Sequence, residues 1–162
     1  MGEEILDQPA PKISILQRRE IQSPLLACVL DGFIEELGYE KALQIASAAI
    51  QKDAALAGKM MAEKYGGNST KELIRMVKEV WADSGALELT VLEETGQTLS
   101  FDVTHCQYAE LYERLGIKEF GFCLSCNRDA ALINGFNSSM HLLRTHTIMQ
   151  GANSCDFRIV ID

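Results

Sequence analysis

Long apolar runs are absent from the sequence: no stretch approaches the roughly 18 to 20 consecutive apolar residues that a membrane-spanning helix requires. The acidic start, Met1-Gly2-Glu3-Glu4, also lacks the basic region and the apolar run of a secretory signal peptide. We therefore expect a cytoplasmic protein with no membrane partner.

Positive charge is scarce. The 162 residues include 15 lysines and arginines against 23 aspartates and glutamates, which gives a net charge of −8, and the largest basic cluster is Arg18-Arg19. Proteins that bind nucleic acid draw most of their affinity from clustered Lys and Arg. The composition therefore argues against a nucleic-acid partner.

An even set of cysteines, as a full disulfide framework would need, is also lacking, because the chain has five. In a reducing compartment this count excludes a disulfide framework as the basis of the fold. The length is that of one domain with a core of its own. We expect a single domain over residues 1–162, with a loose N-terminal arm at 1–12, a helical part at 13–85, and a sheet with two helices at 86–162.

Helical periodicity dominates the first half of the chain. Ser23-Pro24 is typical of an N-cap followed by proline at the first helical position, and apolar residues then recur at helical spacing until Gly38. A second helix is predicted from about residue 40 to residue 64. Ser69 and Glu72 form a capping-box pattern, which predicts that a third helix opens there.

The period then changes from about 3.6 to 2, which predicts a hairpin over residues 87–103. Two short helices follow, from about 108 to 115 and from about 126 to 133, and a second hairpin over 140–149 and 155–161 finishes the chain. This order, ααα-ββ-αα-ββ, predicts an α+β fold in which N-terminal helices pack with an antiparallel sheet of about four strands.

The densest group of reactive residues lies between Cys123 and Asp129. A helix beginning near Cys126 would place Cys126 and Asp129 on one face. The helix dipole would favour the thiolate of Cys126, and Asp129 could exchange a proton. The alternative is that Cys126 is a buried apolar filler and Asp129 an ordinary first-turn residue.

Cys123 and Cys126 form a Cys-x-x-Cys element, which allows two further interpretations. A dithiol redox pair usually follows a strand, and none is predicted before Cys123. A zinc site would need two more ligands from Cys106, Cys155 or the histidines, and no second paired spacing exists. The leading interpretation therefore involves no metal and no cofactor.

Strand alternation indicates which other side chains point inward. His105 shares the phase of the apolar residues of its strand and is the expected core histidine, with Cys106 as the alternative. Arg144 and His146 share the phase of Leu142 and Ile148, although the opposite phase is nearly as apolar. A buried arginine needs an anionic partner, either Asp129 or a bound carboxylate. Cys155 faces the core, where packing alone would explain it.

Several of these segments together resemble the family of L-2-amino-thiazoline-4-carboxylate hydrolases. The likeness rests on Cys126-x-x-Asp129, Phe136, the run from Arg144 to Gly151 and the block Cys155-Asp156-Phe157-Arg158. Cys106-x-Tyr108-Ala109-Glu110, Arg19-Glu20-Ile21 and the segment from Gly38 to Ala42 are also similar, so the likeness covers most of the chain.

This resemblance implies a hydrolase that opens a small cyclic amidine or thiazoline carrying a carboxylate, at a C–N bond other than a peptide bond. It favours Cys126 as the nucleophile or a polar contact, Asp129 as the acid or base, and Arg144 as the carboxylate anchor. Further expected pocket residues are Cys106, Cys155, His146 and Tyr108. Homo-oligomer formation is left open.

The ending, Gly151 followed by Cys155-Asp156-Phe157-Arg158-Ile159, is also similar to vinyl-reductase-type ligand-binding domains. That resemblance implies a pocket that binds or senses a small molecule without hydrolysing it. Cys155 and Phe157 would then be packing residues of the last strand. Cys126, Asp129 and Arg144 discriminate between the two, because a sensor does not need a thiol beside a carboxyl group.

Overall fold

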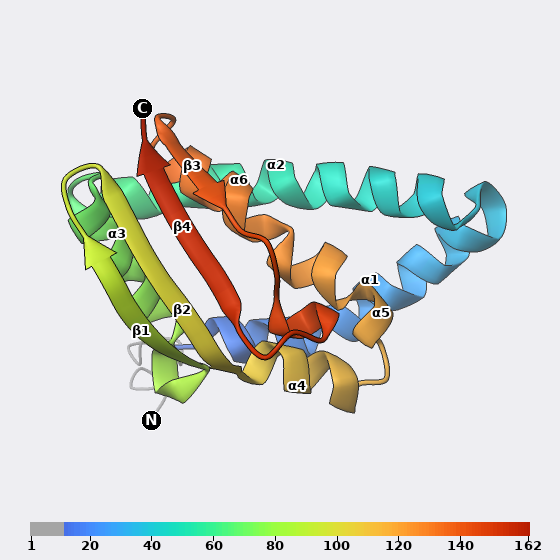
Figure 1. Cartoon of the computed structure of the whole chain (residues 1–162). Coiled ribbons are helices and arrows are strands. Elements are labelled where there is room, and N and C mark those ends of the chain that lie inside the picture. The colour runs from blue at the N-terminus through green and yellow to red at the C-terminus, as the bar shows by residue number, and fades with distance from the viewer. Residues whose placement is uncertain (1–11) are drawn as a thin grey trace, which may run out of the picture.

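Two long helices, α1 (Ile15–Leu37) and α2 (Tyr39–Tyr65), open the computed structural model, which describes residues 12–162 (Figure 1). The expected loose arm lies, apart from Lys12, outside the described residues. No helix among residues 12–162 has the length and apolarity needed to cross a membrane.

Helix α1 begins earlier than predicted. Its N-cap is Ser14, whose hydroxyl accepts a hydrogen bond from the backbone N–H of Gln17, while the Gln17 side chain accepts one from Ser14 N–H. The predicted N-cap at Ser23 is therefore wrong, and Pro24 lies inside the helix. Ser23 is instead buried and donates a hydrogen bond of 2.9 Å to the hydroxyl oxygen of Tyr112.

Helix α3 (Thr70–Met76) begins at the predicted capping box of Ser69 and Glu72. It continues directly into a π-helical turn, η1 (Val77–Trp81), and a short 3-10 turn, η2 (Asp83–Gly85). The π-helical turn carries Val80 and Trp81 to the edge of the cavity described below.

Four antiparallel strands form one sheet in the order β1-β2-β4-β3. The strands are β1 (Leu87–Glu94), β2 (Thr98–Cys106), β3 (Met140–Leu143) and β4 (Cys155–Ile161). Phe101 and Phe157 stack at 4.6 Å between ring centroids and join a core built with α2, α3 and α6. The predicted α+β fold with N-terminal helices and a four-stranded antiparallel sheet is confirmed.

The chain between the two hairpins is more continuously helical than predicted. It forms α4 (Gln107–Arg114), α5 (Lys118–Gly121), the π-helical turn η3 (Phe122–Cys126) and α6 (Arg128–Phe136). Cys126 therefore ends a helical turn and does not begin a helix. The helix α6 runs past the predicted end at about residue 133 and includes Gly135, where a Cβ atom would come within 2.1 Å of the Ala55 carbonyl oxygen. This close approach packs α6 against α2.

A bulge in β2 changes which side chains face the core. Glu88 pairs with His105 but Leu89 pairs with Val103, so Thr104 is an extra residue on β2. Because a single inserted residue reverses the alternation, Cys106 points inward and His105 points outward. The expectation that His105 is a core histidine is wrong: its side chain is 40% exposed and lies 3.6 Å from Glu110.

Candidate functional site

A cavity of about 250 Å³ lies between α1, α2, η1, the inner face of the sheet and the helical segment 118–136. Six of the seven residues expected from the sequence line it: Cys106, Tyr108, Cys126, Asp129, Arg144 and Cys155. Residues from three separate segments of the sequence, 106–108, 126–129 and 144–155, therefore meet at one site.

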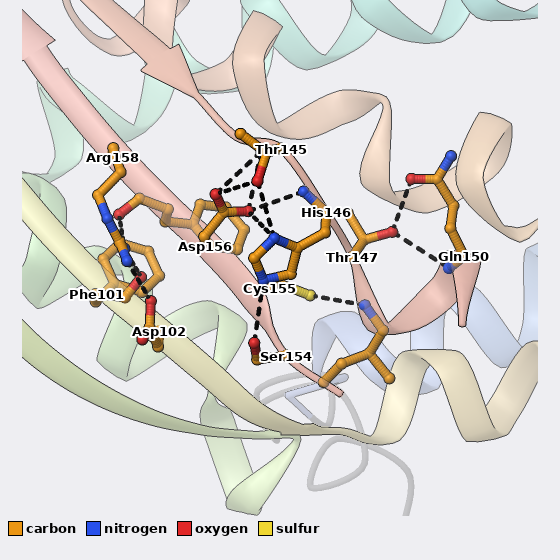
Figure 2. A network of polar contacts seen from close by, with 12 residues as sticks. Phe101, Asp102, Thr145, His146, Thr147, Gln150, Ser154, Cys155, Asp156 and Arg158 are labelled. Atoms are coloured by element: carbon orange, nitrogen blue, oxygen red, sulfur yellow. Dashed lines mark hydrogen bonds and ion pairs between the residues drawn. The ribbon is translucent and has the colours of Figure 1, made fainter. Parts of the chain in front are cut away.

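His146, the seventh residue, lies outside this cavity. Its side chain is 42% exposed, and its ring contacts Asp156, Thr145 and Ser154 (Figure 2). The cause is the short strand β3, which ends at Leu143. Strand alternation stops there and no longer places His146 on the side of Arg144.

Arg144 connects the acidic and thiol-bearing residues. One terminal nitrogen lies 2.5 Å from Oδ2 of Asp129, and the other donates a hydrogen bond of 3.0 Å to the carbonyl oxygen of Cys126. The guanidinium also lies 5.0 Å from the centre of the Phe157 ring. Both terminal nitrogens thus have protein partners, and the side chain of Arg144 is only 10% exposed.

Asp129 is a largely buried carboxyl group with an elevated pKa. Burial raises the pKa above its ordinary value because the charged form loses its hydration, while the guanidinium of Arg144 opposes this effect. A carboxyl group in this balance can both accept and return a proton closer to neutral pH than an exposed aspartate can.

The cavity thiols are protonated at neutral pH. Burial raises the pKa of Cys106 to about 11 and also raises the pKa of Cys155. For Cys126, burial and then the negative charge of Asp129 raise the pKa. The expected activation of Cys126 by a helix N-terminus is therefore wrong, because η3 and α6 leave no free N-terminus there. Reaction at this thiol requires a base.

The two thiols of the Cys-x-x-Cys element have different surroundings. Cys123 is buried and contacts the hydroxyl of Ser47 at 3.3 Å, whereas Cys126 lines the cavity. Within residues 12–162, no group of three or more His, Cys, Asp or Glu side chains is arranged to bind a metal ion. Of the two thiols, only that of Cys126 therefore faces the cavity.

The segment after Arg144 is held by Asp156 at the start of β4 (Figure 2). The Asp156 carboxylate accepts hydrogen bonds from the backbone N–H groups of Thr145 and His146 and from the Thr145 hydroxyl, at 2.8 to 3.1 Å. Burial alone would raise its pKa, but these donors lower the pKa to about 2. Asp156 therefore fixes the backbone next to Arg144.

Three further arginines line the cavity, and the sequence patterns did not assign them to it: Arg18 and Arg19 of α1, and Arg128 of α6. Arg128 pairs with Asp53 of α2 at 2.6 Å. In the sequence, the feature that could have pointed to Arg19 is its place in the segment Arg19-Glu20-Ile21, which is part of the resemblance to the family. Nothing in the local pattern indicated that α1 reaches the thiols.

Helices packed on one face of an antiparallel sheet, with a cavity between the two layers, define an α+β protein with an internal pocket. The chain belongs to the L-2-amino-thiazoline-4-carboxylic acid hydrolase family, whose model matches residues 18–159. The matched range includes all of the predicted site residues.

The fold is also similar to a solved structure, the phenol-responsive sensory domain of the transcription activator PoxR with phenol. The two share 11% sequence identity with a TM-score of 0.55, over 85% of this chain and 73% of that chain. This likeness shows a common fold. Among curated protein sequences, none matches the chain.

Proposed function

We propose that this protein hydrolyses a small cyclic amidine of the thiazoline type that carries a carboxylate, opening the ring at a C–N or C–S bond. The observation that carries the proposal is the contact of one guanidinium, that of Arg144, with both Asp129 and the backbone of Cys126 at the cavity wall. This contact holds a proton acceptor and a thiol at one place. The family name supplies the substrate class.

The chemistry follows from the protonation states. The Sγ atom of Cys126 bonds to the amidine carbon while its proton moves to ionised Asp129, and the electron pair of the C=N π bond moves to the nitrogen. The adduct then expels a ring nitrogen or sulfur, which takes the proton from Asp129. Water repeats the sequence at the same carbon: Asp129 accepts its proton, the Sγ–C bond breaks and the proton returns to Sγ. Arg144 positions Asp129 throughout.

The cavity suits a small ring. Its volume of about 250 Å³ is below the roughly 300 to 1,000 Å³ of pockets for drug-sized ligands. Val103, Leu132 and Phe157 contribute apolar side chains to the lining, beside the polar groups of Cys126 and Asp129. Such a lining shields the bound ring from bulk water and leaves the attacking water molecule to be positioned by the polar groups.

The test is to incubate the purified protein with L-2-amino-thiazoline-4-carboxylic acid and to follow ring opening by mass spectrometry. We expect turnover by the wild type, a loss of at least about 100-fold in Cys126→Ala, and nearly unchanged turnover in Cys123→Ala. Cys123 is a matched control because it is a neighbouring buried thiol that does not line the cavity. Equal rates in both variants would remove Cys126 from the mechanism.

A second candidate function is ligand binding without turnover, and the observation that favours it is the fold shared with the PoxR sensory domain, whose structure contains phenol. The apolar wall of the cavity would accept a ring in either case. The two functions differ in one outcome: a binding domain returns the thiazoline intact, and Cys126→Ala leaves its affinity unchanged.

A further inference from the structure

Arg19 stands out among the charged residues of the cavity. The lining contains four arginines and two aspartates and is therefore positive, although the whole chain carries a net charge of −8. Arg128 pairs with Asp53, and Arg144 pairs with Asp129. Arg18 has no ion pair among the described residues, but its side chain is exposed to solvent. Arg19 is half-buried and forms no ion pair with any of residues 12–162.

The surroundings of Arg19 penalise its charge. Burial lowers its pKa and the nearby positive charge of Arg128 lowers it further, while Tyr112, Tyr108 and Asp53 offset only part of this effect. A guanidinium nevertheless stays protonated at neutral pH, so the fold keeps a desolvated cation at the cavity. A bound anion would remove both penalties at once, since it replaces the lost hydration and screens Arg19 from Arg128.

We propose that Arg19, and not Arg144, binds the carboxylate of the substrate. The inference rests on the proposed function for the identity of the anion. Arg144 has both terminal nitrogens engaged by Asp129 and by the Cys126 carbonyl, whereas the guanidinium of Arg19 keeps its planar donors for a ligand.

A carboxylate site at Arg19 would fix the orientation of the substrate in the cavity. Arg19 belongs to α1, whereas Cys126 and Asp129 belong to the segment 118–136. A carboxylate held at Arg19 orients the ring so that its reacting carbon faces the thiol and the carboxyl group. Arg19 is then the specificity-determining residue for acidic thiazolines.

The experiment uses two probes: L-2-amino-thiazoline-4-carboxylic acid, and 2-amino-2-thiazoline, which has the same ring without the carboxylate. Binding is measured through the fluorescence of Trp81, which is the single tryptophan of the chain and lines the cavity. This readout does not depend on turnover. Failure of the proposed hydrolysis and failure of the Arg19 assignment are therefore separable.

We expect the wild type to bind the acid more tightly than the neutral ring. Arg19→Gln should weaken binding of the acid by about 10- to 100-fold, as expected for a charge-assisted hydrogen bond, and should leave the neutral probe unchanged. Arg19→Lys should recover part of the loss. The control is Arg114→Gln, which removes a positive charge from an exposed pair with Glu20 outside the cavity.

Three results would overturn the assignment. One is a wild type that binds the acid no more tightly than the neutral ring. Another is an Arg19→Gln variant that weakens both probes equally, since that pattern indicates a general disturbance of the cavity. Loss of acid binding in Arg114→Gln to the same extent would also count against it, because it would reflect net charge alone.

Discussion

The guanidinium of Arg144 lies 2.5 Å from the carboxylate of Asp129, and both side chains are largely shielded from water. This pair joins the segment after β3 to the first turn of α6. A buried ion pair adds little net stability compared with an apolar pair, but the loss of one partner leaves a charge without compensation. The stability of the fold therefore depends on whether the Asp129 carboxyl group is protonated.

The first prediction concerns that stability. Arg144→Met should lower the free energy of unfolding by about 3 kcal/mol because it leaves Asp129 buried and unpaired. Urea titration measures this loss. Arg114→Met, which breaks the exposed pair with Glu20, should cost about 0.5 kcal/mol. A loss in Arg144→Met no greater than in this control would show that the buried pair has no such effect.

The second prediction is the pH dependence of hydrolysis. Ionised Asp129 is required as the base, so kcat/KM should fall as the pH drops through its pKa, which burial raises above the ordinary 3.8. Arg144 opposes that rise, so Arg144→Met should move the acid limb to higher pH. Arg144→Lys keeps the charge and should leave the limb near its wild-type position. An acid limb that is unchanged in Arg144→Met would show that Asp129 is not the group that titrates.

The third prediction concerns the thiols. Because burial raises the pKa values of Cys106, Cys126 and Cys155, all three should react slowly with iodoacetamide at pH 7. Exposed Cys28 should be modified first. Alkylation of Cys106 should still accelerate at pH 10, below its pKa of about 11. Peptide mass spectrometry measures the order in which the cysteines are alkylated. Modification of Cys126 before Cys28 at pH 7 would contradict a protonated Cys126 thiol.

The fourth prediction follows from the low pKa of Asp156. A carboxyl group with a pKa of about 2 in the folded chain stabilises the fold at pH values above its unfolded pKa, and this contribution is lost as the pH falls toward 2. Asp156→Asn should therefore cost about 2 kcal/mol at pH 7 and about half of that at pH 3. Unfolding measured at both pH values would contradict this account if the cost did not shrink on acidification.

Local signals explain the parts of the fold that the sequence predicts well. The capping box at Ser69, the stop at Gly38 and the alternation of β1 and β2 each depend on neighbours within a few residues. The failures have non-local causes. Ser23 has the sequence pattern of an N-cap, but its hydroxyl instead donates a hydrogen bond to Tyr112, 89 residues away. The bulge at Thr104 reverses the strand alternation that predicts an inward-facing His105.

The residues of the candidate site also fall into those that local sequence predicts and those that only the tertiary structure places. Cys126 and Asp129 lie three positions apart, so any helical geometry brings them together. Arg144 pairs with Asp129, which is one of the two anionic partners that the sequence predicts for a buried guanidinium, the other being a bound carboxylate. Arg19 reaches the same cavity only through the packing of α1 against the rest of the chain, and no local pattern reveals that approach.

A single-turnover reaction distinguishes catalysis of ring opening in the cavity from simple binding of a ring. Protein in excess is mixed with L-2-amino-thiazoline-4-carboxylic acid, with Trp81 fluorescence reporting binding and mass spectrometry reporting the product. We expect the bound compound to gain one molecule of water in the wild type and to stay intact in Cys126→Ala. Recovery of the compound unchanged from wild-type protein that has bound it would show that the cavity does not catalyse ring opening.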